Sequence, residues 1–177
     1  LIIVLLMGFA SGLPFLLTAA TLSAWLSQAG VTKTLIGFMS WASSVYALKF
    51  LWSPIIDKVR LPGAAHLFGK RRAWMLAAQL LCMVAMIGLG SSDPTSNLTM
   101  TIIWTVLLAI SSATQDIVVD AYRIEILEEP QFGAGAAMTT FGYRIAVIAS
   151  GGGALLLADS FGWLFSYTTM AVLMLVG

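Results

Sequence analysis

The segment LTMTIIWTVLLAISSATQDIVVDAY, residues 98–122, contains two charged residues, Asp116 and Asp120, in a run that is otherwise apolar or carries small polar side chains. A helix needs about 20 mostly apolar residues to cross the hydrocarbon core of a bilayer, which is about 30 Å thick. The segment is long enough to do so. It therefore predicts a membrane-spanning helix with two carboxylates within it or at its end.

Five further apolar runs, separated by short polar breaks, extend this prediction to the whole chain. The expected helices cover about residues 1–26, 34–56, 73–90, 98–122, 133–158 and 163–177. The sequence begins at Leu1 inside an apolar run, and it ends after about 15 residues of the sixth helix, too few to span a bilayer. We therefore expect an all-α membrane protein in which residues 1–177 are the six-helix N-terminal domain of a longer chain, with the sixth helix truncated.

The composition excludes several classes of protein. Charged residues make up 10% of the 177 residues and apolar residues 59%, whereas a soluble domain has about 25% charged residues. Together with a mean hydropathy of +0.94, this excludes a soluble enzyme and a disordered segment. The net charge is only +1, so no basic face for nucleic acid can form. Cys82 is the single cysteine, and we expect no disulfide, metal or cofactor.

The distribution of basic residues predicts the orientation in the membrane. The loop between the second and third helices has five of them, Lys58, Arg60, Lys70, Arg71 and Arg72. The first loop has only Lys33, and the third and fifth loops have none. Because short cytoplasmic loops are enriched in Lys and Arg, we expect the second and fourth loops and the N-terminus to be cytoplasmic.

Four charged residues fall inside the predicted helices: Lys49, Asp116, Asp120 and Arg144. A charged side chain at the centre of a bilayer costs at least about 2.5–3.5 kcal/mol on insertion scales. Such residues must therefore face a protein interior or a water-filled cavity. The third and sixth predicted helices carry no charge within their spans, so we expect the second, fourth and fifth helices to line a polar cavity.

Within residues 98–122 and just beyond them, the polar residues form one stripe. Ser112, Asp116, Asp120 and Arg123 are spaced by four, four and three positions, which places them on one face of a helix. Two carboxylates on adjacent turns favour the uptake of a proton by one of them. Our hypothesis is that Asp116, the deeper of the two, takes up a proton near neutral pH while Asp120 stays paired with Arg123.

The alternative is that the charges form static ion pairs that hold the helices together, and it stays open for Lys49 and Asp120 above all. Buried ion pairs stabilise proteins poorly, and small or hydroxyl side chains can pack membrane helices at lower cost. Arg144, near the middle of its helix, is more simply interpreted as the counter-charge of an anionic substrate.

Two glycine- or proline-containing segments predict irregular helices. Pro14, in the segment Ser11-Gly12-Leu13-Pro14, should free the carbonyl near Ala10 and kink or soften the first helix. Such interruptions often lie at substrate sites of transporters, but a tolerated kink explains the proline equally well. Gly151-Gly152-Gly153 is interpreted as a packing surface or a hinge of the fifth helix.

Other functional classes fit the pattern less well than a transporter. An intramembrane aspartyl protease needs two carboxylates from different helices around one water, but Asp116 and Asp120 belong to one helix. No Ser–His pair or metal-binding motif is present, so we do not expect an enzyme. A channel would favour rings of one type of charge. A non-transporting membrane receptor remains an alternative.

The loop between the second and third helices resembles that of the major facilitator superfamily. The superfamily signature is Gly-x-x-x-Asp-Arg/Lys-x-Gly-Arg/Lys-Arg/Lys. Its counterpart here is Pro54-Ile55-Ile56-Asp57-Lys58, followed by Gly69-Lys70-Arg71-Arg72. Ser53 replaces the leading glycine, and residues 59–68 are inserted before the second part.

A combination of segments is more specific and is similar to the AmpG-type muropeptide permeases, a branch that includes acetyl-coenzyme A transporters. The segments are GFASGLP (8–14), LKFLWSP (48–54), SATQD (112–116) with Tyr122-Arg123, and GYR (142–144) with GGGA (151–154). This resemblance covers nearly the whole chain. It implies one half of a twelve-helix transporter of the bacterial inner membrane, which imports anhydro-muropeptides with protons for the recycling of peptidoglycan. An acetyl-coenzyme A-like or other organic anion is the alternative substrate.

The resemblance also implies roles for particular residues. Substrate-binding residues would be Lys49, Gln115, Tyr143 and Arg144; Asp116 and Asp120 would couple transport to protons; and Asp57, Arg71, Arg72 and Arg123 would form a cytoplasmic gate. The implied partners are a small glycopeptide, protons, the lipid bilayer and a C-terminal half of the same chain, with no nucleic acid and no metal. The gate would be an electrostatic latch that breaks and re-forms during transport, and Asp120 is placed to join it.

Overall fold

The computed structural model describes residues 1–61 and 69–177, and in these ranges the chain is helical without any strand. The helices are α1 (Ile2–Thr18), α2 (Ala20–Gln28), α3 (Lys33–Ser40), η1 (Trp41–Ser43), α4 (Ser44–Leu48), η2 (Lys49–Leu51), α5 (Ser53–Lys58), α7 (Lys70–Ser91), α8 (Leu98–Ile126), η3 (Glu129–Gln131), α9 (Phe132–Ile148), η4 (Ala149–Gly153), α10 (Ala154–Phe161), α11 (Trp163–Leu173) and η5 (Met174–Val176). The expected all-α class is confirmed. The inserted residues 59–68 of the loop signature fall mostly outside the described ranges.

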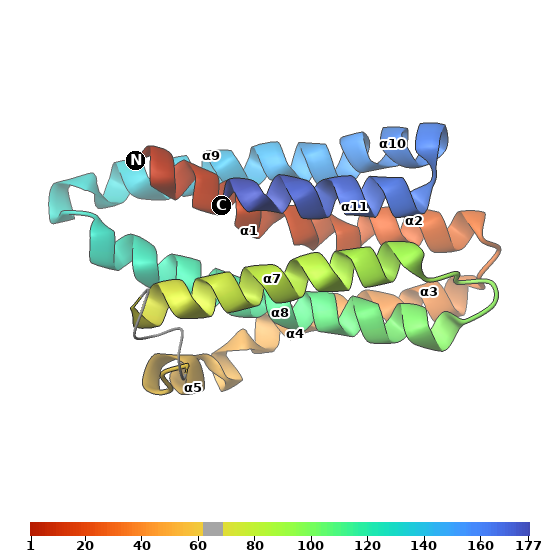
Figure 1. Ribbon diagram of the computed structural model, residues 1–177, viewed down its shortest axis with the longest axis horizontal. Helices are drawn as coiled ribbons and strands as arrows, with labels where there is room; N and C mark the ends of the chain where they lie inside the picture. Colours follow the sequence, from red (N-terminus) through yellow and green to blue (C-terminus); the bar gives the residue numbers. More distant parts are fainter. Residues whose placement is uncertain (62–68) are drawn as a thin grey trace.

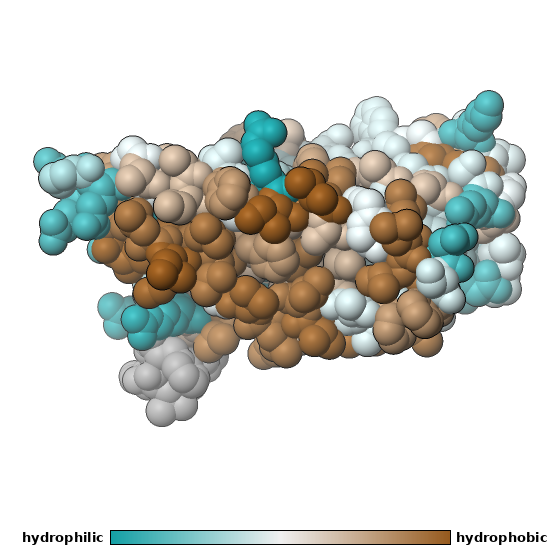
Figure 2. Space-filling view, turned by 90° about the horizontal axis from the view of Figure 1, so that it is seen from above, coloured by the Kyte–Doolittle hydropathy of each residue, from teal (hydrophilic) through white to brown (hydrophobic). Residues whose placement is uncertain are grey.

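Five helical stretches are long and apolar enough to cross a membrane. They are residues 2–28, 33–51, 70–91, 98–126 and 129–161, and residues 163–176 form a shorter apolar helix. Large apolar side chains such as Ile2, Trp41 and Leu156 are exposed on the outside of the bundle. Figure 2 shows one face of it, where a broad apolar surface separates hydrophilic side chains gathered toward the two ends. This surface is what a protein embedded in lipid requires.

The helices run roughly along one axis, so that the bundle has two distinct ends (Figure 1). We call the end at which α5 ends and α7 begins the basic end, because Lys58, Lys70, Arg71 and Arg72 gather there. The turns 28–33, 91–98 and 161–163 lie at the other end, which we call the turn end. The main helix pairs are α1 with α9, α7 with α8 and with α11, and α1 with α8.

The backbones of α1 and α9 are in direct contact, and glycine makes this contact possible. A Cβ atom on Gly8 would collide with the backbone of Thr139, and one on Gly142 would collide with the carbonyl of Leu5. Gly12 lies against Tyr143 in the same way. Small residues let membrane helices approach until their backbones touch. This contact fixes which faces of α1 and α9 are left to line the polar site.

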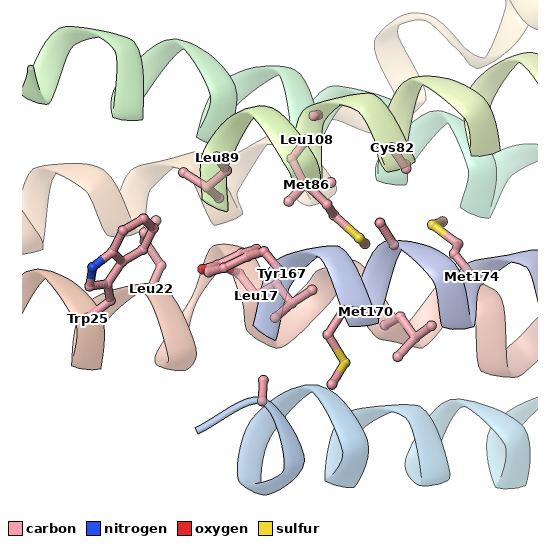
Figure 3. Packing of buried hydrophobic residues seen from close by; sticks show 14 of the residues in the cluster. Leu17, Leu22, Trp25, Cys82, Met86, Leu89, Leu108, Tyr167, Met170 and Met174 are labelled. Carbon is pink, nitrogen blue, oxygen red and sulfur yellow. The ribbon is translucent and has the colours of Figure 1, made fainter. Parts of the chain in front are cut away.

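An apolar core fills the space among α1, α2, α7, α8 and α11 (Figure 3). Tyr167 of α11 is completely buried, and its hydroxyl donates a hydrogen bond to the Leu17 carbonyl at 3.0 Å. Trp25 stacks on Trp163 with ring centroids 5.1 Å apart. Gln79 of α7 is buried as well, and it donates a hydrogen bond to the carbonyl of Met174. α11 is therefore held through both apolar packing and polar contacts.

The span expected at residues 34–56 consists of several short helices rather than one regular helix, and residues 33–51 are long and apolar enough to cross a membrane. The expected span is divided into α3, η1, α4, η2 and α5. The hydroxyl of Ser40 donates to the Ile36 carbonyl at 3.0 Å, a contact that bends helices. Trp52, between η2 and α5, has φ −108°, and Pro54 after it cannot donate a backbone hydrogen bond. Lys49 lies at the start of one of these short 3₁₀ segments.

The first helix is interrupted at Ala19 rather than at the residues before Pro14. α1 continues through Pro14 to Thr18, and Ala19 has φ −116° and ψ −101°. The Thr18 hydroxyl lies 3.0 Å from the Phe15 carbonyl and 3.3 Å from that of Pro14, and it donates to them. α1 therefore continues through Pro14, the carbonyl that Pro14 leaves without its helical donor is that of Ala10, and the kink or softening expected there stays a prediction.

The glycine-rich segment of the fifth helix forms the π-helical turn η4 next to this interruption. The hydroxyl of Thr21, two residues after the break, donates a 2.7 Å hydrogen bond to the carbonyl of Ser150. Gly151 faces the side chain of Leu16, where a Cβ atom would be too close. Two irregularities on neighbouring helices thus lie side by side and are joined by one hydrogen bond.

The turn between α7 and α8 is shaped by two side chains at the turn end. Asp93 accepts hydrogen bonds from the backbone nitrogen and the hydroxyl of Thr95, at 2.9 and 2.7 Å, and these bonds hold the pKa of Asp93 below its usual value. Asn97 caps α8 by accepting from the Met100 backbone nitrogen at 3.1 Å. The turn therefore fixes where α8 begins and which of its residues face the bundle interior.

Candidate functional site

The polar stripe of α8 opens into a cavity of about 250 Å³ between α1, α8 and α9. Its walls are Ser11, Asp116, Val119, Asp120, Arg123, Thr139, Thr140 and Tyr143. Both carboxylates singled out from the sequence, together with Tyr143 and Arg123, are therefore brought to one place. The helices that form the cavity belong to stretches that are long and apolar enough to cross a membrane.

Asp116 is the most enclosed charged residue of this site. Its side chain is 17% exposed. The hydroxyl of Ser11 on α1 donates a hydrogen bond to Asp116 Oδ1, and the Lys49 ammonium lies 3.8 Å from Asp116 Oδ2. The carboxylate is thus shared between a hydroxyl of the first span and a cation of the second.

Asp120, one turn along α8, has two cationic neighbours. Its Oδ2 lies 4.0 Å from Lys49 Nζ, and its Oδ1 lies 3.7 Å from the Arg123 guanidinium. Arg123 also donates a hydrogen bond of 3.4 Å to the hydroxyl of Thr139 on α9. The Asp120 side chain is 54% exposed, so it faces the open part of the cavity.

The four charged groups form one continuous chain, which we call the charge chain: Asp116, Lys49, Asp120 and Arg123. Two cations and two carboxylates sum to zero formal charge. Its members come from the second span and α8, and its ends contact α1 through Ser11 and α9 through Thr139. A neutral chain of this kind lowers the cost of keeping charges at membrane depth.

An aromatic group adjoins the charge chain. Phe15 of α1 packs edge-on against Tyr46 of α4, with ring centroids 5.6 Å apart, and at a tilt against Tyr143 of α9, at 6.1 Å. Phe15 follows Ser11 by one helical turn. These rings therefore join three spans beside the cavity, and each of them is half-buried.

Two of the expected substrate-binding residues lie elsewhere. Gln115 is 1% exposed, faces away from the cavity, and has no partner for its Oε1 among the described residues. The stripe on α8 explains this placement, because Gln115 is rotated by 100° from Asp116. Arg144 is exposed on α9, outside the cavity, and forms none of the ion pairs found in the described ranges.

The residues expected to form a gate meet at the basic end, but in a different arrangement. Arg71 pairs with Asp57 at 2.5 Å and with Glu125 at 2.9 Å, and Lys70 donates to the backbone carbonyl of Asp57. Arg71 thereby links α5, α7 and α8. We call Asp57, Arg71 and Glu125 the basic-end cluster.

Arg72, Asp120 and Arg123 stand apart from this cluster, and the expected latch stays a prediction. Arg72 donates to the hydroxyl of Tyr122 at 3.2 and 3.3 Å and lies over its ring. Asp120 and Arg123 belong to the charge chain instead, because both lie on the cavity face of α8. Arg72 is therefore the one expected gate residue of α7 that pairs with an aromatic ring rather than with a carboxylate, within the ranges described.

Three residues that contact the site or the basic-end cluster have no clear signal in the sequence. Ser11 stands out there only as part of the segment with Pro14, and Thr139 carries no signal beyond its hydroxyl. Glu125 lies beyond the expected end of the fourth helix at residue 122, whereas α8 continues to Ile126. The spacing of Glu125 from Tyr122, one turn along the same helix, is the signal that could have placed it opposite α7.

The site offers no metal centre in the part of the chain that the structure describes. No group of three or more His, Cys, Asp or Glu side chains that could hold a metal ion occurs there. Asp116 and Asp120 are instead occupied by Lys49, Arg123 and Ser11. What the arrangement can do chemically is exchange protons and pair with the charges of a ligand.

Comparison with known proteins gives consistent relatives. Anhydromuropeptide permease of Escherichia coli (strain K12) is 43% identical over 174 residues, which are 98% of this chain and 35% of that protein. Putative transporter AmpG 3 of Rickettsia typhi is 36% identical over 178 residues, with 100% of this chain and 42% of that protein covered. Putative transporter AmpG 4 of Rickettsia conorii is 32% identical over 98% of this chain.

The chain thus spans only part of these relatives: 35% of the length of the E. coli permease and 42% of the length of the R. typhi transporter. They are permeases and transporters by name, which agrees with a membrane-embedded helical bundle that encloses a polar cavity. The family model described as Acetyl-coenzyme A transporter 1 matches residues 1–95. This matched region includes Ser11, Lys49, Asp57 and Arg71. The chain belongs to the acetyl-coenzyme A transporter 1 family, with AmpG-type permeases among its relatives.

Proposed function

We propose that the protein is a secondary transporter of the bacterial inner membrane that imports anhydro-muropeptides together with protons, for the recycling of peptidoglycan. In this proposal residues 1–177 form the N-terminal six-helix half of a twelve-helix major facilitator fold. A second bundle would supply the other side of the substrate cavity. The name of the E. coli relative supports the substrate, and the exposed apolar faces of the bundle support a membrane setting.

The observation that carries the proposal is the charge chain at the cavity. Ionisable groups inside membrane spans mark substrate paths and proton relays, because their cost is otherwise high. Asp116 is enclosed but borders the cavity. A carboxylate in this position can accept a proton from one side of the membrane and release it to the other.

In this proposal the role of each residue in transport follows from its position in the structure. Asp116 is the proton-coupling group, Asp120 keeps the two cations paired, and Lys49 and Tyr143 contact the substrate. Arg144, exposed on α9, would meet an anionic part of the substrate from outside the cavity, whereas Gln115 is left with a packing role. Asp57, Arg71 and Glu125 would open and close the basic end, which the sequence predicts to be cytoplasmic. Arg72 would assist through Tyr122.

The second candidate substrate is an acetyl-coenzyme A-like conjugate. The description of the matched family favours it. Both candidates are large anions, so Lys49 and Arg144 would serve either. The two differ in the groups that the rest of the cavity must recognise, and competition between them distinguishes the two substrates.

The test uses the full-length protein that carries this sequence, reconstituted in vesicles with the basic end on the inside. Uptake of labelled anhydro-muropeptide is measured with and without an inward proton gradient, and with unlabelled acetyl-coenzyme A as competitor. We expect accumulation that depends on the gradient and is insensitive to acetyl-coenzyme A. The Asp116→Asn variant should still bind the substrate but should not accumulate it against a concentration gradient, since it cannot release a proton.

Asp159→Asn is the matched control, because Asp159 is an exposed carboxylate near the turn end. It should accumulate substrate as the unmodified protein does. Uptake that ignores the proton gradient would contradict proton coupling. Uptake of labelled acetyl-coenzyme A in the same vesicles, with no uptake of muropeptide, would assign the transporter to the second substrate.

A further inference from the structure

Lys49 is shared between two carboxylates and is tightly bound to neither. Its Nζ lies 3.8 Å from Asp116 Oδ2 and 4.0 Å from Asp120 Oδ2, whereas a strong charge-assisted hydrogen bond measures about 2.7–2.9 Å. An ammonium group has three donors. The Lys49 side chain is 35% exposed. The cation therefore has both the exposure and the donor capacity to accept another anion.

We propose that a carboxylate of the substrate takes the place of Asp116 at Lys49 when Asp116 is protonated, so that proton and anion bind as one unit. This inference rests on the proposed transport function and specifies how the same site couples its two ligands. The exchange involves no covalent step. A proton is added to Asp116, the Lys49–Asp116 ion pair is lost, and a new ion pair between Lys49 and the substrate carboxylate forms.

The charge count of the site supports this coupling. With Asp116 ionised, the charge chain of two cations and two carboxylates is neutral. A proton on Asp116 leaves a net charge of +1, and a bound carboxylate restores zero. Because an uncompensated charge at membrane depth is costly, the proton favours the anion and the anion favours the proton. Such coupling between two ligands is reciprocal by thermodynamic necessity.

The surroundings favour Asp116 over Asp120 as the group that takes the proton. Asp120 is 54% exposed and has two cations beside it, Lys49 and Arg123. Asp116 is 17% exposed and has only Lys49 among the cations of the described residues. The Ser11 hydroxyl, which donates to Asp116, can also accept a hydrogen bond. It can therefore remain bonded to Asp116 in either protonation state.

The other titratable groups near Asp116 leave this assignment unchanged. They are Lys49 of η2, Asp120 and Arg123 of α8, Tyr143 of α9, Tyr46 of α4 and Cys82 of α7. Lysine and arginine side chains are charged, and phenol and thiol groups are neutral, below about pH 8. α1 contributes the hydroxyl of Ser11 rather than a titratable group. Carboxylate protonation is thus the change available to this site near neutral pH.

The cavity gives a ligand access to the exchange. Asp116 and Asp120, the two partners of Lys49, both form part of its wall. Thr140 and Tyr143 stand across from them on α9, so a ligand between α8 and α9 would face both carboxylates. Lys49 is not itself part of this wall, so a substrate carboxylate in the cavity would reach the partly exposed Lys49 ammonium past Asp116 and Asp120.

The test measures binding rather than transport, with purified full-length protein in detergent. The affinity for anhydro-muropeptide is determined from mildly acidic to mildly alkaline pH, and the same series is repeated with the compound whose carboxyl groups have been amidated. We expect the affinity for the native compound to rise as pH falls, by up to about tenfold per pH unit for one linked proton. The amidated compound should bind weakly and without this pH dependence.

Two substitutions test whether the pH dependence of substrate binding arises at Asp116 and Lys49. Asp116→Asn should bind the native compound at every pH with the affinity that the unmodified protein reaches only at acidic pH. Lys49→Gln should bind weakly at every pH. Lys33→Gln and Asp159→Asn, at exposed positions near the turn end, are the matched controls and should behave as the unmodified protein.

The outcomes separate this inference from the proposed function. A pH dependence that persists in Asp116→Asn, or that is the same for the amidated compound, would overturn the exchange at Lys49. Binding that is equally tight at all pH values would overturn it as well, with the transport function still standing. Failure of the native compound to bind at any pH would overturn the proposed substrate and this inference together. The amidated compound needs no substitution, so the test holds even if a variant fails to fold.

Discussion

At Gly142 the backbone of α9 touches α1 so closely that a side chain cannot be added without movement. A Cβ atom there would collide with the carbonyl oxygen of Leu5. We predict that Gly142→Ala lowers the free energy of unfolding by about 1–3 kcal/mol, the usual cost of overpacking. The midpoint of thermal unfolding in detergent, measured on the full-length protein, checks this.

Gly133, at the start of the same helix, supplies the control for Gly142. A Cβ atom on Gly133 would meet no atom within 4 Å. Gly133→Ala should therefore leave stability unchanged or slightly raised, because alanine favours a helix over glycine. Equal effects of the two substitutions would mean that the α1–α9 contact does not limit packing.

The close contact between α1 and α9 at Gly142 explains which site residues the sequence could reveal and which it could not. A stripe of Asp116, Asp120 and Arg123 follows from spacing along one helix, because its geometry is local. That Ser11 faces Asp116 depends on how α1 is rotated against α8, and close glycine contacts set this rotation. Gln115 illustrates the opposite error. It adjoins Asp116 in sequence, but one step along a helix turns a side chain by 100° and takes it out of the cavity.

Among the helices, the basic-end cluster joins three elements through one arginine. Arg71 contacts Asp57 of α5 and Glu125 of α8, and both carboxylates are half exposed. We predict that Asp57→Asn and Glu125→Gln each lower the free energy of unfolding by less than about 1 kcal/mol, as solvent-exposed ion pairs do. Unfolding of the two single variants and the double variant, compared as a double-mutant cycle, measures the effect.

The loss in free energy of unfolding of the double variant should differ from the sum of the losses of the two single variants, because the two carboxylates share Arg71. Strict additivity would show that the two ion pairs act independently and would argue against a single cluster. Arg72→Gln is the comparison within the same helix turn, since it removes the contact with Tyr122 but leaves Asp57 and Glu125 paired.

The π-helical turn η4 gives a prediction for a whole helix. A π-turn is a single-residue insertion into an α-helix, so removal of one residue should restore α-helix and keep the segments on either side in register. Gly152 is the residue to remove, because a Cβ atom there would meet nothing within 4 Å. We predict that the deletion of Gly152 leaves a folded protein but slows transport, as π-turns tend to lie at functional sites.

Deletion of Ala136 is the matched control, since this residue lies within the regular part of α9. That deletion should rotate everything on one side of it by 100° and abolish folding. Circular dichroism and size-exclusion chromatography measure folding, and vesicle uptake measures transport. Normal transport after deletion of Gly152 would show that the π-turn is a packing feature alone.

Helix positions follow from length and hydropathy, whereas irregularities within helices do not. Each predicted span overlaps a helical stretch of the structure, because burying twenty apolar residues leaves few other options. The break at Ala19 and the π-turn η4 are joined by the hydrogen bond from Thr21 to Ser150, a contact between helices that a sequence pattern does not record. The second span is broken next to local features, the Ser40 hydroxyl on the Ile36 carbonyl and Pro54 after Trp52, which length and hydropathy alone do not reveal.

For the molecule as a whole, the apolar core and the charge chain occupy different parts of the bundle, and α1 and α8 contribute to both. Leu13 and Leu17 of α1 and Leu108 of α8 are completely buried in the core. Ser11 and Asp116 of the same helices face the cavity. The core can therefore remain packed while the charges at the cavity rearrange, as the proposed transport cycle would require of this bundle.

The final prediction concerns the orientation of the whole bundle in the membrane. Basic residues gather at the end formed by Lys58, Lys70, Arg71 and Arg72, and such ends are retained on the cytoplasmic side. Single cysteines at exposed positions test this: Lys33→Cys and Asp159→Cys at the turn end, and Glu129→Cys at the basic end. In intact cells a membrane-impermeant maleimide should label the first two, and it should label the third only after lysis.

The cysteine that the sequence already contains, Cys82, should not interfere with this measurement. Cys82 is 0% exposed and lies in the apolar core among α1, α7 and α11, so it should not react until the bundle unfolds. It can stay in place while any cysteine elsewhere in the full-length protein is replaced by serine. Labelling of Glu129→Cys in intact cells, with Lys33→Cys protected, would invert the orientation. Asp116 would then face the opposite proton gradient, and import by the proposed exchange would become export.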